Sequence, residues 1–158
     1  MFYYRSPGAD QPITLQRARL TTGLALVLYP VGALLPVVAG SITAARLIGL
    51  CLIAIAFACA LLMGKTTLQR IVGEEASRLD EYELKLRARA TSMVYQILSA
   101  LVLAGVFYLA VATDAGWWYP KSYEEFNGLF WGIFLYCFML PGFILAWQAE
   151  ATDLGPQD

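Results

Sequence analysis

The sequence contains no histidine, and its three cysteines, Cys51, Cys59 and Cys137, form no Cys-x-x-Cys motif. Structural zinc sites are built from cysteine and histidine, and disulfide frameworks need cysteines that can pair in an oxidising compartment. A haem held by histidine ligands within this chain alone is excluded for the same reason. We therefore expect no metal site, no disulfide framework and no bound cofactor.

Charge is also scarce. Charged residues make up 15% of the chain and hydrophobic residues 59%, with a mean hydropathy of +0.59, whereas soluble domains are about one-quarter charged. The long apolar runs have no ionisable residue in their middle. Ion-coupled transport usually depends on such a residue, and catalysis needs a nucleophile, a base or a metal. The sequence thus predicts a membrane protein that is not an enzyme.

Four apolar runs follow one another along the chain: Leu20–Ala45, Leu47–Gly64, Ala90–Thr113 and Phe126–Ala149. Each approaches the roughly 20 helical residues that cross a bilayer, and none alternates as a barrel strand would. We predict an all-α integral membrane protein with four transmembrane helices, arranged as two hairpins in a four-helix bundle. The expected divisions are a tail at 1–19, a hairpin at 20–64, a linker at 65–90, a second hairpin at 91–148 and a tail at 149–158.

Basic residues are distributed unevenly between the two sides of these runs. Nine lie before the first run or between the second and third, whereas only Arg46 and Lys121 lie in the other two connections. Because basic residues are retained on the cytoplasmic side, the linker and both termini are predicted to be cytoplasmic, in a bacterial inner membrane.

Small residues recur every four positions in the first two runs, at Gly32, Pro36 and Gly40 and at Ala45 and Gly49. This spacing permits close helix contact, so the first hairpin should be tightly packed. Prolines at positions 30, 36 and 141 are expected to kink their helices.

The linker from Lys65 to Arg89 is the one substantial polar segment, with six basic and five acidic residues. Glutamates precede bases by four residues, and an apolar stripe recurs near a period of 3.5, which predicts a helix that bends near Gly73 and is continuous from Leu79 to Ala112. Its stripe could pack on the protein's own bundle, dock a partner, or place bases beside anionic lipids. Nucleic-acid binding is unlikely because the carboxylates would repel phosphates. The predicted partner-binding residues are Glu74, Arg78, Leu79, Tyr82, Glu83, Leu86 and Arg87.

The segment LDEYELKLRARA at Leu79–Ala90, followed at once by an apolar run, resembles a pattern in small uncharacterised bacterial inner-membrane proteins. In that pattern an acidic D-E-x-E turn precedes bases and a transmembrane helix, and Tyr82 stands where a base is commoner. Some members are encoded beside a helix-turn-helix regulator and are suspected of restraining it. The resemblance therefore implies a regulatory role, and it carries over no catalytic residues.

Two further groups of polar residues are candidates for function. Ser92, Gln96 and Ser99 form a polar stripe near the start of the third run, which typically supplies hydrogen bonds between helices. Trp117, Trp118 and Tyr119 predict an aromatic belt at the opposite membrane interface.

The leading functional hypothesis is a non-enzymatic interaction or regulatory protein that docks a partner through the linker helix. Its partners would be the lipid bilayer and either another protein or further copies of itself. The alternatives are a small oligomeric transporter or channel subunit, and a structural accessory subunit of a larger membrane complex.

Overall fold

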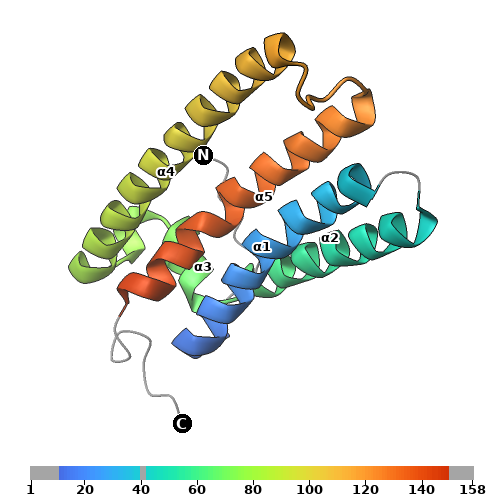
Figure 1. The fold of residues 1–158 in the computed structure, drawn as a ribbon. Helices are drawn as coiled ribbons and strands as arrows, with labels where there is room; N and C mark the ends of the chain where they lie inside the picture. Colours follow the sequence, from blue (N-terminus) through green and yellow to red (C-terminus); the bar gives the residue numbers. More distant parts are fainter. Residues whose placement is uncertain (1–10, 40–41, 150–158) are drawn as a thin grey trace.

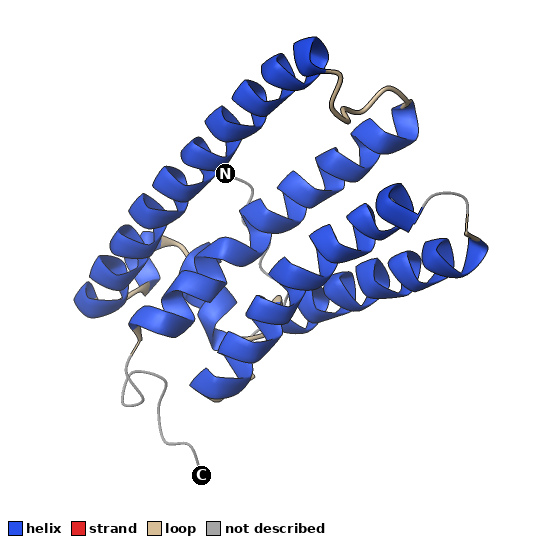
Figure 2. Cartoon of the chain, viewed as in Figure 1, coloured by secondary structure: helices blue, strands red, loops and turns tan. Residues whose placement is uncertain are grey.

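The computed structural model describes residues 11–39 and 42–149. Within them the chain forms five α-helices and one 3-10 turn: α1 (Leu15–Ala39), α2 (Thr43–Met63), α3 (Thr67–Gly73), η1 (Ala76–Arg78), α4 (Glu81–Ala115) and α5 (Tyr123–Gln148). Figure 2 shows helices and connecting loops, with no strand drawn in these ranges. The helices α1, α2, α4 and α5 are long and apolar enough to cross a membrane. The all-helical class and the four membrane-length helices are thereby confirmed.

The linker differs in part from the expected helix with a bend near Gly73. A turn at Gly64–Thr66 separates α3 from α2, and after α3 ends at Gly73 the chain makes only the short turn η1 before α4 begins. The predicted break near Gly73 and the long helix beyond it are both present. The stretch between them is extended at Glu74, Glu75 and Leu79, where the backbone ψ angles lie between 137° and 154°.

Helices α1 and α2 approach each other at two glycines. A β-carbon added at Gly32 would lie 2.7 Å from the Gly49 carbonyl oxygen, and one added at Gly49 would lie 2.6 Å from the Gly32 carbonyl oxygen. Pro36 packs beside this contact, since its Cγ would lie 3.3 Å from the same added carbon at Gly49. The small-residue faces therefore bring the two backbones together, as the four-residue spacing predicts. Both α1 and α5 remain helical through their prolines.

Helix α5 is central and contacts α1, α2, α3 and α4, so that the long helices follow in the order α4, α5, α1, α2 (Figure 1). Two tyrosines join α5 to α1: the Tyr29 hydroxyl donates to the Gly128 carbonyl at 2.5 Å, and the Tyr136 hydroxyl donates to the Leu26 carbonyl at 2.8 Å. The second half of α5 lies in the core and buries Leu135, Met139, Leu140, Ile144 and Leu145.

Helix α4 lies at the edge of this arrangement. It packs through Leu86, Ala90 and Val94, whereas most of its residues between 100 and 110 are exposed. Only 6% of its most apolar window is buried within the chain, compared with 44% for α5. Most of the surface of α4 is thus left to lipid or to another protein.

Candidate functional site

The start of α4 is fixed by a capping box. The Asp80 carboxylate accepts a hydrogen bond from the Glu83 backbone N–H at 2.6 Å, and the Glu83 carboxylate accepts one from the Asp80 N–H at 3.3 Å. These bonds satisfy donors that the first helical turn leaves free. The D-E-x-E motif therefore has a structural role here, because its first and last residues define where α4 begins.

Ionic contacts join α3 to α4. The Arg70 guanidinium donates to the Glu83 carboxylate at 2.8 Å, and this pair is three-quarters or more buried. Arg87 donates to the Glu74 carbonyl oxygen at 2.6 Å. Hydrogen bonds with an ionised partner are stronger than neutral ones, so these contacts hold the linker against the first turns of α4.

The residues predicted to bind a partner divide into two groups. Glu74, Leu79 and Leu86 are buried within the chain, and Glu83 and Arg87 are partly buried in the contacts just described. Arg78 and Tyr82 are exposed, with Tyr82 at 49%. The apolar stripe of the linker therefore packs mainly on the protein's own core, because α3 folds back beneath α4.

A second face of α4 points away from these contacts. It is formed by residues that recur at intervals of three or four, and we call it the α4 face: Glu81, Lys85, Arg89, Ser92 and Gln96. All five are exposed, and a 2.8 Å ion pair joins Lys85 to Glu81. Ser99 continues the line and is half-buried. The predicted polar stripe is thus the membrane-directed extension of a charged helix face.

No hydrogen bond from the Ser92, Gln96 or Ser99 side chains to another helix is found among the described residues. The expected bonding between helices is therefore not made within this part of the chain. The neighbouring Thr91 hydroxyl instead donates to the Arg87 carbonyl of its own helix at 2.8 Å. The polar groups of the stripe remain available to a partner outside the chain.

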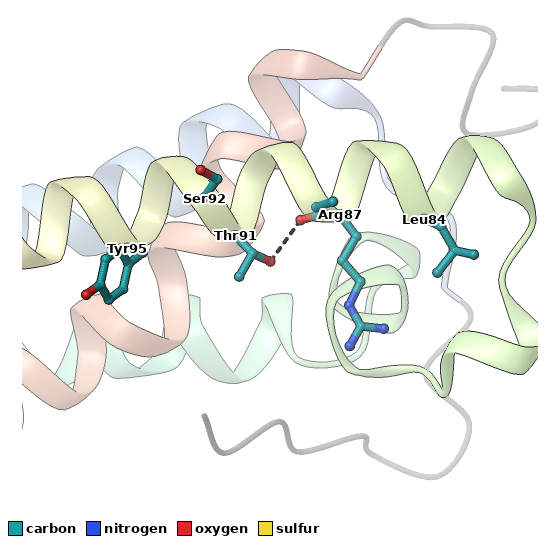
Figure 3. Close-up of a pocket in the computed structure, with 6 residues that line it drawn as sticks. Leu84, Arg87, Thr91, Ser92 and Tyr95 are labelled. Carbon is teal, nitrogen blue, oxygen red and sulfur yellow. Dashed lines mark hydrogen bonds between the residues drawn. The ribbon is translucent and has the colours of Figure 1, made fainter.

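A hollow of about 510 Å³ runs along the flank of the α4 face. All of its lining residues among the described ranges belong to α4. Figure 3 shows Leu84, Arg87 and Tyr95 on one side of the helix and Ser92 on the other. The walls are mainly apolar, with the Arg87 guanidinium and the hydroxyls of Thr91, Ser92 and Tyr95 as polar groups. A shallow apolar groove beside a row of polar residues is better suited to bind the side of a partner helix than to bind a small ligand.

The other predicted groups lie at the opposite end of α4. Trp117 and Trp118 are exposed and Tyr119 is half-buried, in the loop that joins α4 to α5. The Tyr108 hydroxyl donates to the Trp118 carbonyl at 2.7 Å, which fixes this loop to α4. A second capping box, between Ser122 and Glu125, starts α5. Exposed aromatic residues thus lie between two membrane-length helices, and their place at a membrane interface stays a prediction.

Within the described ranges, no group of three or more cysteine or acidic residues is placed to hold a metal ion. Compared with known protein families, with curated proteins and with solved structures, the chain has no match.

The grouping of Glu81, Lys85 and Arg89 on one exposed face was not predicted, although their four-residue spacing is visible in the sequence. The capping role of Asp80 and Glu83 was not predicted either, although an acidic residue followed three positions later by glutamate is a signal for a helix start.

Proposed function

We propose that this protein is a non-enzymatic interaction or regulatory protein of the bacterial inner membrane, which docks a protein partner along the α4 face. In this proposal the four membrane-length helices form two hairpins, and the linker and both termini are cytoplasmic. The excess of basic residues in the linker and before the first apolar run supports this orientation.

The observation that carries the proposal is the outward position of Ser92 and Gln96. Both lie on a membrane-length helix, both are exposed, and neither is hydrogen-bonded to another helix within the described chain. Polar side chains on a transmembrane helix are worth about 0.6 kcal/mol or more each when a neighbouring helix bonds to them. A partner helix laid along α4 would supply those bonds.

The contacts at the base of α4 support the same function. Because Arg70 and Arg87 fix the buried side of the junction, the first turns of α4 present Lys85 and Arg89 in a defined geometry before any partner arrives. Pre-organised surfaces bind with a smaller loss of conformational entropy. The regulatory part of the proposal rests on the resemblance of Leu79–Ala90 to proteins encoded beside transcriptional regulators.

Exchanging the charges of one ion pair tests the docking proposal. The double substitution E81K/K85E keeps the net charge, and therefore the membrane orientation, while it inverts the pattern of the α4 face. We expect it to remove a protein that co-purifies with the wild type in mild detergent, and Gln96→Leu to do the same.

Val102→Leu is the matched control, since Val102 is exposed on another side of α4. A photo-crosslinker placed at Gln96 should give a protein adduct, and one at the exposed Leu61 of α2 should not. An unchanged set of co-purifying proteins in both test variants would refute docking through this face. An adduct to a second copy of the chain would identify the partner as a homo-oligomer.

A small transporter or channel subunit is the second candidate function. A second hollow, lined by residues of α1, α2 and α5, favours it, because these three helices are all long and apolar enough to cross a membrane.

A further inference from the structure

The second hollow has a volume of about 480 Å³ and lies near the start of α5. Three aromatic residues from three different helices line it: Tyr29 of α1, Phe57 of α2 and Trp131 of α5. The volume falls in the range of small-molecule sites, about 300–1,000 Å³. The hollow shares no residue with the α4 face.

The rings stand nearly perpendicular to one another. The Tyr29 and Phe57 ring centroids are 6.0 Å apart at an interplanar angle of 80°, and those of Phe57 and Trp131 are 5.9 Å apart at 80°. These are edge-to-face contacts, so the three rings pack against one another and together form one aromatic wall of the hollow. Aromatic faces carry negative potential, and a cage of such faces is the usual protein site for a quaternary ammonium group.

Tyr29 is held firmly in this wall. Its hydroxyl donates to the Gly128 carbonyl at 2.5 Å, and its ring lies against Gly132, where an added β-carbon would be 2.8 Å from Tyr29 Cε1. Tyr29 is 5% exposed. The aromatic wall is therefore largely formed before a ligand arrives, which lowers the entropic cost of binding.

The charge at the hollow also favours a cation. Glu124 and Asn127 line it, both are exposed, and the Glu124 carboxylate takes part in no ion pair among the described residues. The positive end of the α5 dipole is met by Glu125, whose carboxylate accepts the Lys121 and Ser122 backbone N–H groups. Glu124 is thus left to face a ligand, and it would repel an anion.

We propose that the hollow binds an organic ammonium group, carried either by a free small cation or by a lipid headgroup. The alkylated nitrogen would lie against the aromatic wall of Tyr29, Phe57 and Trp131, and Glu124 would balance its charge. Asn127 would contact a polar substituent of the same ligand.

Choline is a suitable probe, with 3,3-dimethylbutan-1-ol as its neutral counterpart of the same shape. Binding of labelled choline to the protein in nanodiscs of phosphatidylglycerol, a lipid without an ammonium headgroup, is measured by equilibrium dialysis. We expect saturable binding of choline and at least tenfold weaker competition by the neutral alcohol. Trp131→Leu should weaken choline binding roughly tenfold, and Glu124→Gln roughly two- to fivefold.

Gly128→Leu should abolish binding, because an added β-carbon there meets nothing within 4 Å and the larger side chain would fill the hollow. Gly105→Leu is its matched control on α4, where an added carbon also meets nothing within 4 Å, and choline should bind it as it binds the wild type.

Glu124→Gln is an exposed change that leaves the fold intact, and Asp114→Asn is its control at the same end of the molecule.

Adding phosphatidylcholine to the nanodiscs separates the two ligand sources. Displacement of choline by this lipid, with the lipid retained in native mass spectra, would identify a headgroup site, whereas choline binding that the lipid leaves unchanged would identify a free cation. Equal binding of the neutral alcohol, unchanged binding in both Gly128→Leu and Trp131→Leu, or no saturable binding to the wild type would each overturn the proposal.

Discussion

Replacing Gly49 with alanine should weaken the contact between α1 and α2. The added methyl carbon would lie 2.6 Å from the Gly32 carbonyl oxygen, whereas ordinary contacts begin at 3.4 Å. The two helices would have to separate at this point by about 0.8 Å, which is the difference between these two distances. A carbonyl oxygen of a helix cannot rotate away as a side chain can, so the whole interface must adjust.

Overpacking of a well-packed interface costs about 1–3 kcal/mol. The helix-forming advantage of alanine over glycine offsets little of this, because membrane helices unfolded in detergent remain helical. We therefore expect Gly49→Ala to lower the free energy of unfolding by about 2 kcal/mol, which raises the unfolding equilibrium constant roughly 30-fold.

The assay is reversible unfolding in mixtures of dodecyl maltoside and sodium dodecyl sulfate, followed by tryptophan fluorescence. Gly105→Ala is the control, because an added carbon there meets nothing within 4 Å, and it should change stability by less than about 0.5 kcal/mol. The double substitution G32A/G49A should cost less than the sum of its parts, since either change already separates the helices. Equal stability of the Gly49→Ala and Gly105→Ala variants would refute the reasoning.

Two other predictions concern the start of α4 and the membrane orientation. Asp80→Ala removes the N-cap and should destabilise the start of α4 by about 1 kcal/mol, seen as faster hydrogen exchange of its first amides; Ser122→Ala should act only at the start of α5. Unchanged exchange at Glu83 would contradict the capping role of Asp80. A reporter fused at Ser77, in the exposed turn η1, should report a cytoplasmic position, and a periplasmic signal would overturn the proposed orientation.

The helices themselves could be predicted because bilayer-length apolar runs have few alternative structures. The pairing of Gly32 with Gly49 was predictable only as a contact between small-residue faces. Their register depends on where Pro36 packs, and this is not encoded in the four-residue spacing.

The candidate site was less predictable. Leu79 and Leu86 follow the same helical period whether they face a partner or the chain's own core, and their burial depends on α3 folding back onto α4. Tyr29, Phe57 and Trp131 lie on three separate helices, and no local pattern indicates that they share one hollow. Contacts between distant segments decide both features.

Helix α4 is packed against its neighbours mainly near its start, so a small tilt there would move its far end by a larger distance. It is buried near Leu86, Ala90 and Val94 and then again only at Ala112, and it extends a further 21 residues from Val94 to Ala115, about 32 Å at 1.5 Å per residue. A tilt of about 10° about its packed start would displace the far end by about 5 to 6 Å. The loop fixed there by Tyr108 leads directly into the first turn of α5, where Glu124 lies. In the proposed docking, a small tilt of α4 caused by a partner would thus become a larger displacement beside the first turn of α5, which lines the aromatic hollow.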